Sequence, residues 1–146
     1  MDHAQVISAM AEQVEWYRRL AKLAELQHVY VQNEQTEELL GVLAQRQGVL
    51  NEVARLEAVV GPARKQWGEY VAGLGDQKTV AEALMAETRR LLEEITASDR
   101  NDALVLQQRK LNLGRQIHQA SAARQVNNRY AAAAYTGSAG RVDLSR

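Results

Sequence analysis

Two residues that could ligate a metal ion lie on the first stretch with helical periodicity. Glu25 and His28 are three positions apart, which matches the Glu-x-x-His element of di-iron helical bundles. Such a centre needs a second element of this kind, and neither His3 nor His118 has a Glu three residues before it. The chain contains no Cys, which excludes thiolate ligands and thiol nucleophiles. We therefore expect no metal site and interpret His28 as a surface histidine.

A second segment, Gly73 to Thr79, superficially resembles a phosphate-binding loop because glycines, a Lys and a Thr precede a helical pattern. The motif requires a preceding strand, four residues between its glycines and a Gly directly before the Lys, and this segment has none of these. We interpret it as a turn between helices. The sequence also shows no clustered Ser/His/Asp set and no opposed carboxylate pair. We expect neither enzymatic activity nor a cofactor.

The composition predicts the fold class. Hydrophobic residues make up 46% of the 146 residues, yet there is no Phe and a single Pro. Ala, Leu, Gln and charged residues dominate, and these are mostly strong helix formers. We expect an all-α fold: an elongated antiparallel helical hairpin or three-helix bundle with a long C-terminal helix and a flexible tail.

Apolar residues that recur every three or four positions set the expected helix bounds. They predict a single helical domain over 1–127, with helices at about 3–32, 36–60, 63–72 (short) and 79–127, and a flexible tail over 128–146. Asp2 is a candidate N-cap of the first helix, Gly61-Pro62 is expected to end the second, and Thr79 with Glu82 fits a capping box for the last. Ser98–Asp102 is a run of poor helix formers, where we expect a kink or a short break.

The last expected helix is longer than its neighbours. At 1.5 Å per residue it would span about 70 Å, against about 40 Å for each of the first two. Either the first two helices stack end to end against it, or its second half carries an apolar stripe without a partner inside the chain. That stripe is Leu106, Leu113, Ile117 and Ala120. It predicts a partner in trans, which is another protein or a second copy.

Charge is balanced over the whole chain but not along it. The 18 basic residues equal the 18 acidic ones. Residues 1–97 hold 10 basic and 15 acidic groups, whereas 98–146 hold 8 and 3. The basic groups of the second part are spread around the helix, which favours a solvated face or a face for an acidic partner over nucleic-acid binding. Tyr130 and Tyr135 lie in an Ala-rich stretch that no core is expected to reach, which makes them docking candidates.

The sequence also bears on localisation. No run approaches the ~18 apolar residues of a membrane span, and Met1-Asp2-His3 lacks the layout of a secretory signal. We expect a cytoplasmic protein with no membrane insertion.

The pattern as a whole resembles the FlgN family of flagellar export chaperones. The resemblance covers most of the chain. In the first half it lies in a first helix ending near His28-Val-Tyr-Val-Gln, a second helix starting Thr36-Glu-Glu-Leu-Leu-Gly with the Gln/Arg-rich Val42-Leu-Ala-Gln-Arg-Gln-Gly-Val-Leu, the Gly61-Pro62 break and Trp67. In the second half it lies in the long helix around Leu91-Leu92-Glu-Glu-Ile95 with Asp99 and Asp102, and in an Ala-Tyr-x-Gly tail ending Arg141-Val-Asp143. The Ala-rich end of the stripe and the presence of two tail tyrosines depart from the family's pattern.

The resemblance implies a chaperone that binds amphipathic terminal helices of flagellar hook-associated (junction) proteins, prevents their premature assembly and delivers them to the flagellar type III export apparatus. The cargo face would be Leu106, Leu113, Ile117 and Ala120. Tyr130 or Tyr135 would dock the complex on an export-gate component.

Two other function classes are compatible with the same residues. In a structural coiled-coil protein or adaptor, the stripe would form a homodimer. In a nucleic-acid-binding helical protein, the basic third would bind duplex with a strong salt dependence. The expected oligomeric state therefore stays open at the level of the sequence.

Overall fold

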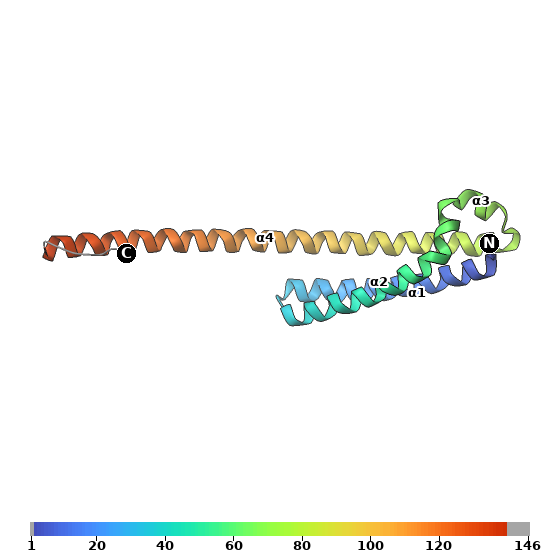
Figure 1. Ribbon diagram of the computed structural model, residues 1–146, viewed down its shortest axis with the longest axis horizontal. Coiled ribbons are helices and arrows are strands. Elements are labelled where there is room, and N and C mark those ends of the chain that lie inside the picture. The colour runs from blue at the N-terminus through green and yellow to red at the C-terminus, as the bar shows by residue number, and fades with distance from the viewer. Residues whose placement is uncertain (1, 140–146) are drawn as a thin grey trace. The chain divides into compact units, whose positions relative to one another are not determined.

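The computed structural model describes the backbone of residues 2–139 and the side chains of residues 2–132. That part of the chain is helical and has no strand, which confirms the all-α class and the long C-terminal helix. The helices are α1 (His3–Gln32), α2 (Thr36–Lys65), α3 (Trp67–Ala72) and α4 (Lys78–Ala139), with a short 3-10 helix η1 (Gly75–Gln77) before α4 (Figure 1). The chain divides into two units, Met1–Val105 and Leu106–Arg146.

α1 begins and ends where the periodicity predicted. The Asp2 side chain accepts hydrogen bonds from the backbone N–H groups of Ala4 at 3.1 Å and Gln5 at 3.4 Å. These two groups have no carbonyl partner inside the helix, so the cap supplies what the first turn lacks.

The turn between α1 and α2 places a non-glycine residue in the left-handed region. Glu34 has a φ of 56°. Its N–H donates to the carbonyl of Val31 at 3.3 Å, and the Gln35 N–H donates to the carbonyl of Tyr30 at 2.9 Å. This is the Schellman pattern of a helix C-terminus, in which Gly usually takes the position that Glu34 holds here.

The first unit is held by apolar side chains of three helices. Near the start of α1, one cluster joins Val6 and Met10 to residues late in α2 and early in α4, namely Leu56, Val60, Ala81 and Met85. Further along α1, a second cluster joins residues of all three helices: Val14, Leu20, Leu23, Val42, Val49, Leu91 and Ile95. α2 therefore runs antiparallel to α1 and the first part of α4 runs parallel to α1, as Figure 1 shows.

The expected stop of the second helix at Gly61-Pro62 was wrong, because α2 continues to Lys65. Proline inside a helix removes one hydrogen bond and clashes with the carbonyl four residues earlier, at a cost of about 3 kcal/mol. The residues on both sides offset this cost, since Val60 is 0% exposed and Ala63 is 1% exposed. Figure 1 shows α2 bending toward its end, as expected beside an internal proline. The short third helix consequently starts at Trp67 instead of 63.

Three features of α4 also differ from expectation. The helix starts at Lys78, so Thr79 lies inside it and does not serve as the N-cap of a capping box. The helix runs through Ser98–Asp102 without a break. It ends at Ala139, beyond the expected end at 127. Residues 140–146, which include the Arg141-Val-Asp143 element, lie outside the described part of the chain.

Candidate functional site

The described side chains of the second unit are almost all exposed. From Leu106 to Ala131, the described residues are exposed, apart from Arg109, which is intermediate. The exposed set includes large apolar residues: Leu106 is 45% exposed, Leu113 57% and Ile117 62%. Ala120 is exposed as well. Each predicted cargo-face residue is therefore accessible.

The helical register brings these four residues together on one face. At about 100° per residue, the spacing of seven, four and three keeps Leu106, Leu113, Ile117 and Ala120 within an arc of about 60°. We call this line of four side chains the apolar seam. Burying a Leu or Ile side chain contributes about 1.5–3 kcal/mol, so a helix laid along the seam would gain several kcal/mol from it.

Of the two tyrosines predicted for docking, the structure describes the side chain of Tyr130 only. Tyr130 is 73% exposed, and its register places it about 100° around the helix from Leu113, so it does not share the apolar seam. Tyr135 falls within the bounds of α4, but its side chain lies outside the described residues.

The charged residues between Asp102 and Asp143 are all basic, because this stretch of the sequence contains no acidic residue. The exposed or half-exposed basic residues of the segment are Arg109, Lys110, Arg115, Arg124 and Arg129. The apolar seam thus lies in a positive field.

Sequence reasoning missed a hollow on another side of the same helix. Gly114 has no Cβ, and nothing lies within 4 Å of where one would stand. A shallow groove forms around it, lined by Gln107, Lys110, Leu111, Gly114, Arg115, His118 and Gln119. Its one large apolar wall, Leu111, is 52% exposed. The signal available in the sequence was Gly114 itself, inside an otherwise strong helical pattern.

In the first unit, several polar residues that are far apart in the sequence lie close together in the structure. Asp102 of α4 is 1% exposed. Its carboxylate lies 2.8 Å from Nδ1 of His28 and accepts from Nε2 of Gln27 at 3.2 Å. Arg46 of α2 donates to Oε1 of Gln27 at 2.6 Å and to both carboxylate oxygens of Asp99 at 2.7 Å. We call these five residues the polar cluster.

The polar cluster explains why Ser98–Asp102 stays helical. Asp is a poor helix former because its side chain competes for nearby backbone groups. Here Asp99 and Asp102 bond to α1 and α2 instead. The pKa of Arg46 is raised above its ordinary value, chiefly by the hydrogen bonds to Asp99, so the guanidinium stays charged. The cluster therefore fixes how the three helices of the first unit are aligned.

Glu25 is exposed, and His28 belongs to the polar cluster. The His28 side chain is 41% exposed, and its Nδ1 lies 2.8 Å from the Asp102 carboxylate, so this histidine at the surface also contacts α4. Among the side chains that the structure describes, no three of the His, Asp and Glu groups gather as metal ligands would.

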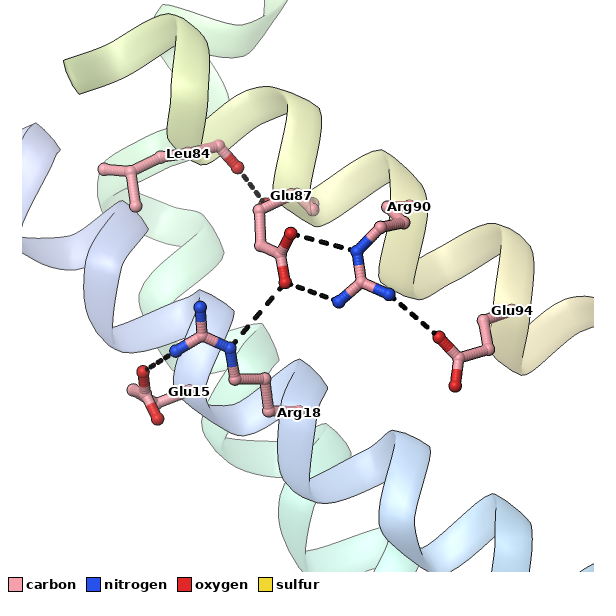
Figure 2. Close-up of polar contacts among 7 residues, drawn as sticks. Glu15, Arg18, Leu84, Glu87, Arg90 and Glu94 are labelled. Carbon is pink, nitrogen blue, oxygen red and sulfur yellow. Dashed lines mark hydrogen bonds and ion pairs between the residues drawn. The ribbon is translucent and has the colours of Figure 1, made fainter.

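A second polar network joins α1 to α4 at the surface (Figure 2). Glu87 accepts hydrogen bonds from Arg90 at 2.6 and 3.0 Å, and its Oε1 lies 3.7 Å from Nε of Arg18. The network extends to Glu15 beside Arg18 and to Glu94, which lies 3.2 Å from Arg90. The hydrogen bonds from Arg90 are the main reason that the pKa of Glu87 lies below its ordinary value. Arg18 and Arg90 are half exposed or more, so solvent screens the network strongly.

Within the described residues, no helix has the length and apolar character needed to cross a membrane. The chain matched no model of a known protein family, no curated protein and no solved structure.

Proposed function

We propose that this chain is a cytoplasmic export chaperone of the FlgN type, which binds an amphipathic terminal helix of a flagellar hook–filament junction protein. One observation carries the proposal: Leu106, Leu113 and Ile117 are exposed along one face of α4. A helical protein gains nothing in stability by leaving such a line in water, whereas a binding protein needs it accessible. The flagellar cargo is supported by the resemblance of the sequence to that family.

The proposed mechanism is capture of one helix by another. In this proposal, cargo helices that would otherwise assemble through their apolar faces are kept apart because the chaperone covers those faces. The apolar seam offers the i, i+4, i+7 pattern through which amphipathic helices pair. Tyr130, exposed and off the seam, would remain accessible for docking on an export-gate component while cargo occupies the seam.

The test is recovery of cargo from the cytoplasm in which the chain is made. The tagged wild type is expected to recover a junction protein, and Leu113→Asp with Ile117→Asp is expected to reduce recovery at least about tenfold while helicity is kept. The matched control is Asn112→Asp with Gln116→Asp, because both residues are exposed, have the same spacing and lie off the seam. Failure of the wild type to recover any junction protein would refute the chaperone function. Equal loss with the control pair would show that added charge, and not the seam, is responsible.

A further inference from the structure

Two basic residues occupy the same line as the apolar seam. The positions Leu106, Lys110, Leu113, Ile117, Ala120 and Arg124 are spaced four, three, four, three and four residues apart. This is the d-a-d-a-d-a repeat of a coiled-coil stripe, in which Lys110 and Arg124 fall at a positions. Both side chains are exposed. They are two heptads apart, or about 21 Å along the helix.

These two positions disfavour pairing with a second copy. In a parallel pair, Lys110 would face Lys110 and Arg124 would face Arg124. In an antiparallel pair, a positions lie opposite d positions, so with Leu113 opposite Ile117, Lys110 would face Ala120 and Arg124 would face Leu106. The parallel pair sets like charges opposite each other, and the antiparallel pair packs each charge against an apolar side chain without an acidic partner; both arrangements are unfavourable. No acidic residue between Asp102 and Asp143 is available on the copy to relieve the repulsion.

On these grounds, and resting on the proposed function, we propose that the seam takes an amphipathic helix of a different protein that carries Asp or Glu at two a or d positions about two heptads apart. The carboxylates would lie opposite Lys110 and Arg124, and apolar residues would cover Leu113, Ile117 and Ala120 between them. Complementary charge at both ends fixes the register and favours this occupant over a second copy.

Nucleic acid and anionic lipid fit the surface less well. Arg115 and Arg129 lie on the opposite side of the helix from the seam, so the positive groups do not form one track for a phosphate backbone. A membrane-surface helix needs one broad apolar face, whereas Leu111 and Ile117 lie on different sides of this helix.

The experiment uses two synthetic helical peptides of about four heptads with Leu at the a and d positions. One peptide has Glu, and the other Lys, at the two positions meant to face Lys110 and Arg124. We expect the full chain to bind the Glu peptide at least about tenfold more tightly at low salt, with the difference shrinking as salt is added. Lys110→Glu with Arg124→Glu should reverse the preference. Arg115→Glu with Arg129→Glu should not, because these residues have the same spacing on the other side.

Several results would overturn the inference. Equal binding of both peptides, lost in Leu113→Ser with Ile117→Ser, would refute the charge selection but leave the proposed function standing. Binding of neither peptide would also refute the charge selection, and the cargo-recovery experiment would then test the proposed function separately. A wild-type dimer in light scattering that Leu113→Ser with Ile117→Ser dissociates would make a second copy the occupant. Tighter binding of a DNA duplex or of anionic phosphatidylserine vesicles than of the Glu peptide would assign the surface to those ligands.

Discussion

Arg46 of α2 donates one hydrogen bond to each carboxylate oxygen of Asp99 on α4, both at 2.7 Å. The planar guanidinium matches the two oxygens in a way that Lys cannot. Its third contact, to Oε1 of Gln27 at 2.6 Å, brings α1 into the same cluster. The Arg46 side chain therefore links all three helices of the first unit at one point along their length.

The Arg46 and Asp99 pair should be energetically coupled. In a double-mutant cycle with Arg46→Ala and Asp99→Ala, we expect a coupling of about 1–2 kcal/mol, reduced from a fully buried pair because Asp99 is partly exposed. Urea unfolding of the four proteins measures it. The control cycle uses Arg55 and Glu52, which are paired at the surface and should show a much smaller coupling. Equal coupling in both cycles would contradict the alignment role of Arg46.

Removing the buried carboxylate of Asp102 should destabilise the first unit. Asp102→Ala leaves the Gln27 amide and the His28 ring nitrogen without their acceptor, and the loss of one partner of a buried hydrogen bond costs about 1–3 kcal/mol. The urea midpoint measures the change. Asp76→Ala, at an exposed position, should shift stability by no more than about 0.5 kcal/mol. A similar small effect at Asp102 would mean that the polar cluster is unimportant for stability.

The fold could be predicted from the sequence where the determinants are local. Asp2 and the apolar spacing were enough to predict the bounds of α1, because capping and periodicity act within a few residues. The continuation of α2 past Pro62 could not be predicted in this way. It depends on the burial of Val60 and Ala63 against other helices.

The same distinction applies to the candidate sites. The apolar seam was visible in the sequence because its four residues lie on one helix and need no tertiary contact to share a face. The polar cluster was not visible in the sequence, because Asp99 and Asp102 are poor helix formers and suggest a break when only neighbouring residues are considered. Their partners Gln27 and Arg46 are more than 50 residues away along the chain.

Glu87 should contribute to the pH dependence of stability. Its pKa is lower in the folded state than its ordinary value, chiefly through Arg90. A group with a lowered folded pKa stabilises the protein above its unfolded pKa and loses this contribution as the pH falls through the folded pKa. Between about pH 7 and pH 3, the thermal midpoint should therefore fall further in the wild type than in Glu87→Gln. Parallel pH profiles would show that the network in Figure 2 contributes nothing.

The turn residue Glu34 offers a route to higher stability. With a φ of 56°, it occupies a region that costs an L-residue about 1–2 kcal/mol and costs Gly nothing. Glu34→Gly should raise the free energy of unfolding by up to about 1 kcal/mol, since the greater entropy of Gly in the unfolded chain offsets part of the gain. Glu34→Asn should lie between the two, because Asn tolerates this conformation. Denaturant unfolding of the three proteins measures the order, and destabilisation by Gly would contradict it.

The central claim, that the apolar seam binds a helix of another protein, is tested most directly by photo-crosslinking in the cells that make the chain. A photoreactive residue in place of Leu113 should yield an adduct of this 16.3 kDa chain with a hook–filament junction protein, and the same residue in place of Asn112 should yield much less. An adduct at position 113 that contains only a second copy of the chain, or no adduct at all, would contradict the claim.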